Sequence, residues 1–215
     1  MPHETAQLDL LRRRLLAAAL ARAGQEGWTA RTLAKAEADA GLTTGTAGLA
    51  CPAGVVDLID FWGLECDRAA AAALGALDLQ ILRIRERVRT GVLARLEAIG
   101  AGHREAARRA MARLALPDAA QRGAAILWRA ADTIWRGIGD TSTDANHYSK
   151  RAILSGVFAS TFAVWLEGDA AATEAFLDRR IENVMAFEKA KARARKLREG
   201  LPDPLGVLAR MRHGR

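Results

Sequence analysis

A polar stretch at residues 139–151 holds the side chains of this chain whose types and spacing are most suited to shared chemistry. If a helix begins near Asp144, His147 and Arg151 lie four residues apart and Tyr148 and Arg151 three apart, so all three share its first two turns. An arginine then stands at the start of a long apolar helix, as in a site for an apolar molecule with a polar end. An ordinary capped connection between two helices accounts for the same pattern.

Two apolar segments flank this stretch and must position it. The segment before it carries Trp128 and Trp135, which are seven residues apart and hence on one face of a helix. The segment after it carries Phe158 and Phe162. Gly139 predicts the end of the first helix. The two tryptophans either pack as ordinary core or form the wall of a ligand cavity or partner surface, and the spacing leaves both interpretations open.

The composition of the whole chain predicts an all-α protein with a substantial core. The chain has 215 residues, of which 50% are hydrophobic and only five are proline, so a single domain of helices is expected. Residues 66–98 are predicted as one long helix because Leu74, Leu77, Ile81 and Ile84 keep a helical period.

The net charge of +7 lies mainly at one end of the chain. Residues 188–215 carry nine basic and three acidic residues, so the rest of the chain is close to neutral. This balance disfavours nucleic-acid binding by the body, and the basic end suits either anionic lipid headgroups or plain solvation. No apolar run is long enough to predict a transmembrane helix. Cys51 and Cys66 fit no metal or redox spacing, which indicates a reducing compartment.

The sequence contains no catalytic constellation. It has no nucleophile elbow, P-loop, dinucleotide fingerprint or His-Glu-x-x-His motif. Asp144 and His147 are spaced for neighbouring metal ligands, but a metal site needs further ligands that the chain does not supply. We therefore expect no enzyme activity, no metal and no cofactor.

The first 60 residues resemble the helix-turn-helix of tetracycline-repressor-type regulators. Thr29 predicts the cap of a second helix and Gly41 its end, followed by a short third segment at residues 44–50. That segment has no arginine, lysine or aromatic residue, whereas a DNA-reading helix needs donors for base edges and cations for phosphates. We expect no nucleic-acid partner, and a transcriptional regulator of this type is the alternative function.

Three further motifs carry a resemblance that spans nearly the whole chain. They are Trp128-x-x-Ala-Asp132-x-Ile-Trp135, then Gly139-Asp-x-Ser-Thr-Asp144-x-Asn146-x-Tyr148-x-Lys-Arg151, and finally Phe176-Leu-Asp-Arg-Arg-Ile181-x-x-Val-Met185. With the helix-turn-helix-like start, they resemble the lipid-binding accessory family of coenzyme Q (ubiquinone) biosynthesis. A bacterial member is expected, since no leader precedes the first helix.

The resemblance implies a tetracycline-repressor-like helical fold, a homodimer, and an apolar tunnel for an isoprenoid quinone or a phospholipid. It also implies a non-catalytic role in presenting that lipid to a di-iron hydroxylase that acts late in the pathway. Arg151 matches the family's lipid-contacting arginine, and Asp144, His147 and Tyr148 match its partner-binding run. The chain departs from that run, because Ala145 and His147 stand where the family has phenylalanine and tryptophan.

These observations define three parts of the chain. Residues 1–60 are the helix-turn-helix-like part, residues 61–199 the lipid-binding body and residues 200–215 a basic tail. Within the body, the segments 122–138 and 152–167 are expected to line the lipid cavity. The expected location is the cytoplasm, peripheral to the inner membrane of a bacterium. The predicted lipid-contacting residues are Arg151, Trp128, Trp135, Phe158 and Phe162.

Overall fold

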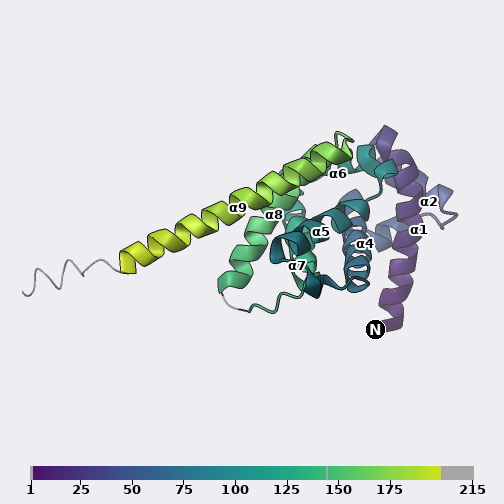
Figure 1. Ribbon diagram of the computed structural model, residues 1–215. Coiled ribbons are helices and arrows are strands. Elements are labelled where there is room, and N and C mark those ends of the chain that lie inside the picture. Colours follow the sequence, from purple (N-terminus) through teal and green to yellow (C-terminus); the bar gives the residue numbers. More distant parts are fainter. Residues whose placement is uncertain (1, 144, 200–215) are drawn as a thin grey trace, which may run out of the picture. The chain divides into compact units, whose positions relative to one another are not determined.

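The computed structural model describes residues 2–143 and 145–199, and within these ranges every element is a helix. The all-α prediction is therefore confirmed (Figure 1). By its internal contacts the chain divides into two units, residues 1–177 and residues 178–215. The first unit contains the complete helices α1 to α8 and the start of α9, while the second begins within α9. The predicted tail at 200–215 lies outside the described residues.

The bounds of the elements follow the breaks in the sequence. The order is α1 (Pro2–Glu26), α2 (Ala30–Asp39), α3 (Thr46–Ala50), α4 (Val55–Gly75), η1 (Leu79–Ile81), α5 (Ile84–Glu97), η2 (Ala101–His103), α6 (Arg104–Leu114), α7 (Ala120–Gly137), α8 (Ala145–Trp165) and α9 (Ala170–Glu199). The predicted boundary between residues 60 and 61 falls inside α4.

The start of the chain follows its local signals closely. The hydroxyl of Thr29 accepts a hydrogen bond from the amide of Thr32 at 3.1 Å and so caps α2 as predicted. Gly41 takes a positive φ of 60° just beyond the end of α2. Helix α3 has only five residues, and Leu49 on it is exposed. It offers no cation for a DNA phosphate, so nothing in its geometry favours the regulator alternative.

The prediction of one helix over residues 66–98 is wrong. Helix α4 ends at Gly75, and α5 begins only at Ile84. Asp78 breaks the run because its carboxylate accepts a hydrogen bond from the amide of Gln80 and caps the short η1. The carboxylate of Glu86 then accepts a hydrogen bond from the amide of Arg83 at 2.9 Å and caps the start of α5.

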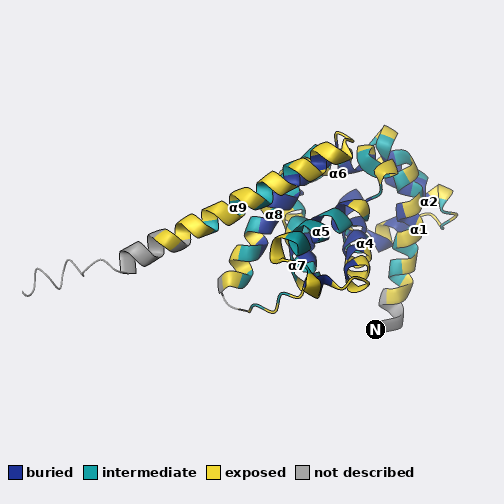
Figure 2. Ribbon diagram, viewed as in Figure 1, coloured by how far each residue is buried: buried dark blue, intermediate teal, exposed yellow. Residues whose placement is uncertain are grey.

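Helix α4 lies at the centre of the first unit and packs against α5, α6 and α7. Figure 2 shows it as largely buried, in contrast to the outer faces of its neighbours. Two glycines permit close approach of the packed helices. A Cβ at Gly91 on α5 would lie 2.5 Å from Ile134 of α7, and one at Gly137 on α7 would lie 2.7 Å from Leu74 of α4. Helices α4, α5 and α7 thus pack against one another, and α5 and α7 also contact α8.

The connection between α7 and α8 begins with the break predicted at Gly139, which has a φ of 91°. The amide of Gly139 donates to the carbonyl of Arg136, and the amide of Asp140 donates to that of Trp135 at 2.9 Å. This pair of bonds forms a Schellman motif that satisfies the last carbonyls of α7. The chain leaves α7 in a fixed direction, and Asp140 turns back toward α8.

Candidate functional site

Arg151 on α8 is fully buried, with 1% of its surface exposed, and its guanidinium binds the α7 side of the connection. Its Nε lies 2.6 Å from the carboxylate of Asp132, and its Nη1 lies 3.2 Å from that of Asp140. The same Nη1 donates to the carbonyl oxygen of His147 at 3.2 Å. Arg151 therefore joins α8 to Asp132 of α7 and to Asp140 of the connection.

Asp140 is the centre of the ionic cluster in the connection. It lies 2.6 Å from Nζ of Lys150, and its carboxylate accepts a hydrogen bond from the hydroxyl of Ser142 at 2.7 Å. Burial by itself would raise the pKa of Asp140, but the hydrogen bonds from Lys150, Ser142 and Arg151 lower it to about 2. The carboxylate is thus held in its charged form well into the acid range.

The predicted partner-binding residues divide between surface and interior. Asp144 lies outside the described residues. His147 is half-buried, and its Nδ1 donates to the carbonyl oxygen of Ser142 at 2.9 Å. Tyr148 is 66% exposed, and its ring lies 6.2 Å from that of Trp128 on α7. Tyr148 and Trp128 thus form an exposed aromatic pair across the two helices.

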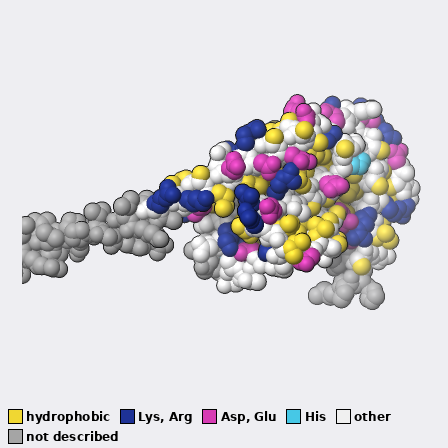
Figure 3. All heavy atoms as spheres, in the orientation of Figure 1, with side chains coloured by type: hydrophobic (Ala, Val, Ile, Leu, Met, Phe, Trp, Pro, Cys, Tyr) yellow, Lys and Arg dark blue, Asp and Glu magenta, His cyan; other side chains and the backbone are white. Residues whose placement is uncertain are grey.

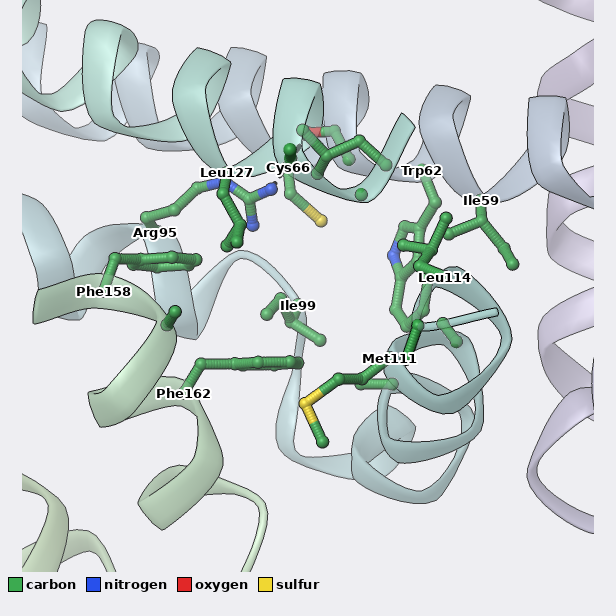
Figure 4. A pocket seen from close by; sticks show the side chains of 18 of the residues that line it. Ile59, Trp62, Cys66, Arg95, Ile99, Met111, Leu114, Leu127, Phe158 and Phe162 are labelled. Atoms are coloured by element: carbon green, nitrogen blue, oxygen red, sulfur yellow. Dashed lines mark hydrogen bonds between the residues drawn. The ribbon is translucent and has the colours of Figure 1, made fainter. Parts of the chain in front are cut away.

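An apolar cavity of about 400 Å³ lies between α4, α5, α6, α7 and α8 (Figure 4). This size is within the range of small-molecule sites. Phe158 and Phe162 of α8 form one side, with parallel rings whose centroids are 6.2 Å apart. Trp62, Ile99 and Leu127 contribute other parts of the wall. The cavity is thus built from five helices, whereas the sequence predicted only two.

Of the five predicted lipid-contacting residues, the structure brings Phe158 and Phe162 into this cavity. Trp128, Trp135 and Arg151 do not line it. Trp135 packs against a buried cluster in which α4, η1 and α7 meet, and its Nε1 donates to the carbonyl of Lys150 at 3.1 Å. Arg151 precedes Phe158 by seven residues on α8, roughly 10 Å along the helix axis, and it lines a separate polar hollow beside the connection. Lipid contact by these three residues stays a prediction.

One charged side chain, Arg95 of α5, lies in the wall of the apolar cavity. It is 3% exposed, and its Nε lies 2.6 Å from the carboxylate of Asp67 on α4. Sequence reasoning missed both residues. A signal was present, because Arg95 continues the helical spacing of Val88 and Val92 and so belongs to their buried face.

Four lining residues are also exposed, and they mark where the cavity meets solvent. They are Met111 and Ala115, at the end of α6 and just beyond it, with Ala120 and Ala124 at the start of α7. Met111, at 42% exposed, is the largest of them. A chain-like ligand longer than the cavity can leave through this mouth with its end in contact with apolar side chains.

Two further features of the described residues bear on the class of site. Within the part of the chain that the structure describes, no group of three or more histidine, cysteine, aspartate or glutamate side chains is arranged to hold a metal ion. No helix in that part is long and apolar enough to cross a membrane.

Fold and cavity together define a protein whose described residues form only helices around an apolar cavity. Residues 120–188 match the family model described as COQ9. The chain is 29% identical over 187 residues to the ubiquinone biosynthesis protein COQ9, mitochondrial, of Rattus norvegicus, an alignment that covers 82% of this chain and 59% of that protein. With the Homo sapiens protein of the same name it shares 28% identity over 187 residues, covering 82% and 58%.

The chain therefore resembles the COQ9 family, as its sequence motifs predicted. Its alignments span less than two thirds of the length of these relatives. The matched range includes α7, α8 and part of α9, and hence the connection and the half of the cavity wall that carries Phe158 and Phe162.

Proposed function

We propose that this chain is a non-catalytic accessory protein of ubiquinone biosynthesis. It binds an isoprenoid quinone intermediate or a phospholipid and presents it to a di-iron hydroxylase. The observation that carries the proposal is the apolar cavity of about 400 Å³ in a chain that resembles proteins named for ubiquinone biosynthesis. It requires no cofactor of its own.

The binding free energy comes from burial of apolar surface. Each CH₂ group that leaves water for an apolar site contributes about 0.8 kcal/mol in the ideal limit. The parallel rings of Phe158 and Phe162 on α8, with centroids 6.2 Å apart, give a tail or quinone ring a flat surface to stack on. The tail of a longer lipid extends through the mouth at Met111.

Delivery to a hydroxylase requires a surface that the partner recognises near the lipid site. The exposed Trp128–Tyr148 pair lies on α7 and α8, the two helices that also contribute Leu127 and Phe158 to the cavity. Exposed aromatic residues commonly anchor protein interfaces. This surface, with His147 and Asp144 beside it in sequence, is the proposed hydroxylase contact.

The proposed protein forms a homodimer in a bacterial cytoplasm. It makes a reversible, peripheral contact with the inner membrane. On the face shown in Figure 3, acidic and basic side chains of the body are intermixed. That surface favours neither a nucleic acid nor strong electrostatic adhesion of the body itself. The basic residues at the end of the chain are better suited to meet anionic headgroups.

Lipid analysis of the purified chain tests the proposal. Organic extraction followed by mass spectrometry is expected to release an isoprenoid quinone or a phospholipid at close to one molecule per chain. Ala159→Phe, which fills the cavity from α8, should lower that amount at least tenfold while the fold stays intact. Ala163→Phe on the same helix is the control, because Ala163 is exposed and does not line the cavity. An empty wild-type chain contradicts the proposal.

A further inference from the structure

The Arg95 guanidinium has one donor group that no atom of the described residues uses. Its Nε binds Asp67, and its Nη2 donates to the carbonyl of Gly63 at 3.1 Å. Its Nη1 is buried, and among the described residues it has no hydrogen-bond partner. Figure 4 shows the side chain reaching along the cavity wall beside Cys66 and Leu127. A buried donor without a partner carries a free-energy cost that a suitable ligand atom removes.

The charges around Arg95 are already balanced. Arg95 and Arg129 share Asp67, whose carboxylate lies 2.6 and 2.8 Å from their Nε atoms. Further contacts extend this into an ion-pair chain of alternating sign from the cavity wall to the surface, with three cations and three anions: Arg95, Asp67, Arg129, Asp60, Arg122 and Asp57. Burial by itself lowers the pKa of Arg129, but hydrogen bonds with Asp67 and Asp60 raise it above the ordinary value. Arg129 therefore stays charged near neutral pH.

This charge balance decides which kind of ligand atom can accept a hydrogen bond from the free Nη1 group. An anion bound at Nη1 would leave an uncompensated negative charge in an apolar cavity, which is strongly unfavourable. An uncharged oxygen receives a charge-assisted hydrogen bond and leaves the charge balance unchanged. The cavity therefore fits a neutral acceptor, such as a carbonyl oxygen, on an otherwise apolar molecule.

We propose that Arg95 binds the polar end of the ligand through Nη1 and that this end is an uncharged oxygen, as in a quinone ring. The inference rests on the proposed lipid-binding function and deepens it, because it prefers a quinone to a phosphate headgroup in this cavity. Figure 4 shows Arg95 and Met111 on opposite sides of the cavity. The ring thus lies beside Arg95 and Phe158, and the tail runs toward the mouth at Met111.

Three matched probes test this on the delipidated full chain. A trimethyl-decyl-benzoquinone has a fully substituted ring and so does not add to the Cys66 thiol. Decylpentamethylbenzene replaces its two carbonyl groups by methyl-bearing carbons, and decylbenzoate supplies an anion. Binding is followed by displacement of a fluorescent fatty probe in wild type, Arg95→Lys and Arg129→Lys. Arg129 also pairs with Asp67 but does not line the cavity, so its variant reports any purely structural effect.

The preference for the quinone over the hydrocarbon is expected to be at least about tenfold larger in wild type than in Arg95→Lys. It should be unchanged in Arg129→Lys. The same two probes are used with wild type and with each variant. Differences in the hydration of the probes therefore cancel when the preferences are compared. In the infrared spectrum, the carbonyl stretch of the quinone bound to wild type should shift to lower frequency than in an alkane. That measurement decides the matter even if Arg95→Lys does not fold.

Each remaining outcome counts against a defined part of the proposal. Equal quinone preference in all three proteins, with an unshifted carbonyl stretch, overturns the role of Arg95 but leaves lipid binding in place. If Arg95→Lys weakens decylbenzoate binding more than quinone binding, the polar end is anionic and the inference is wrong. If none of the probes binds and no lipid co-purifies, the proposed function fails and this inference fails with it.

Discussion

Trp128 of α7 and Tyr148 of α8 lie side by side at the surface, with ring centroids 6.2 Å apart and planes inclined by 32°. His147 packs edge-on against the same tyrosine at 5.2 Å. The motif that this chain resembles has a tryptophan where His147 stands. An indole nevertheless lies next to Tyr148, because α7 supplies Trp128 from twenty residues earlier in the sequence. The structure therefore retains an exposed aromatic surface at the proposed hydroxylase contact.

Truncation of this surface is predicted to weaken hydroxylase binding without unfolding the chain. Trp128→Ala and Tyr148→Ala should each cost about 2 kcal/mol of binding free energy, as aromatic anchors of interfaces do. Isothermal titration with the purified di-iron hydroxylase measures the loss. Leu49→Ala is the control, since Leu49 is an exposed apolar residue on α3. Equal effects of all three substitutions would remove the special role of the aromatic pair.

Arg151→Ala is predicted to lower the free energy of unfolding by about 3 kcal/mol, because it leaves the carboxylates of Asp132 and Asp140 without their buried partner. Arg136→Ala is the matched control. Arg136 also pairs with Asp132, at 2.8 Å, but its side chain is 71% exposed, so its loss should cost well under 1 kcal/mol. Urea unfolding compares the two variants. A similar cost for both would show that Arg151 is not the lock between α7 and α8.

The predicted headgroup contact of Arg151 is separable from its structural role. Arg151→Lys keeps a positive charge beside Asp132 and Asp140 but removes the planar fork of donors. If Arg151 also binds a headgroup, lipid content should fall in folded Arg151→Lys and stay normal in Arg136→Ala. Mass spectrometry of the extracted lipid gives the answer. Full lipid content in Arg151→Lys would leave Arg151 with the structural role alone.

Stability is predicted to fall in acid because of Asp140. Its folded-state pKa of about 2 lies below its ordinary 3.8, so its contribution is fully present above about pH 4. That contribution is lost as the pH falls toward 2 and amounts to about 2 kcal/mol. Urea unfolding between pH 5 and pH 2 measures the slope. Asp140→Asn cannot titrate, so its stability should change less steeply over this window; parallel curves would contradict the assignment.

The two cysteines provide an internal comparison for access to the cavity. Both thiols are buried, and burial raises the pKa of each, which slows reaction with polar reagents. Cys66 lines the cavity, whereas Cys51 does not. N-ethylmaleimide, which is small and apolar, should label Cys66 at least several-fold faster than Cys51. Added quinone should slow only the Cys66 reaction, as followed by peptide mass spectrometry. Faster labelling of Cys51 would indicate that the cavity does not admit ligands.

Local signals in the sequence were sufficient for much of the helical framework. Thr29, Gly41 and Gly139 act through their own backbone and nearest neighbours, so their roles as cap or break can be read from the chain alone. The motifs around Asp144 and Arg151 were likewise sufficient to predict the resemblance to a family of ubiquinone biosynthesis proteins. Neither kind of signal depends on which helices meet in space.

The apolar period over residues 66–98 shows where such reading fails. Leu77, Ile81 and Ile84 continue the spacing of Leu74, yet they are exposed, while Leu79, which is out of step, is buried. Hydrophobic spacing shows only which residues are apolar. A turn that places these residues at the surface gives the same sequence pattern as a helix that buries them. Only the tertiary contacts of Leu79 with the cluster at Leu74 and Ile138 distinguish the two cases.

The binding cavity depended on tertiary structure for the same reason. Its wall comes from five helices, and its one charged group is held by a partner 28 residues away in sequence. The sequence alone determined that an apolar, helical protein with a polar α7–α8 connection would form. The packing of the helices decided that the cavity lies beside Phe158 and Arg95. An unfilled volume arises from how side chains on separate helices meet, and the order of residues along a single helix does not contain that information.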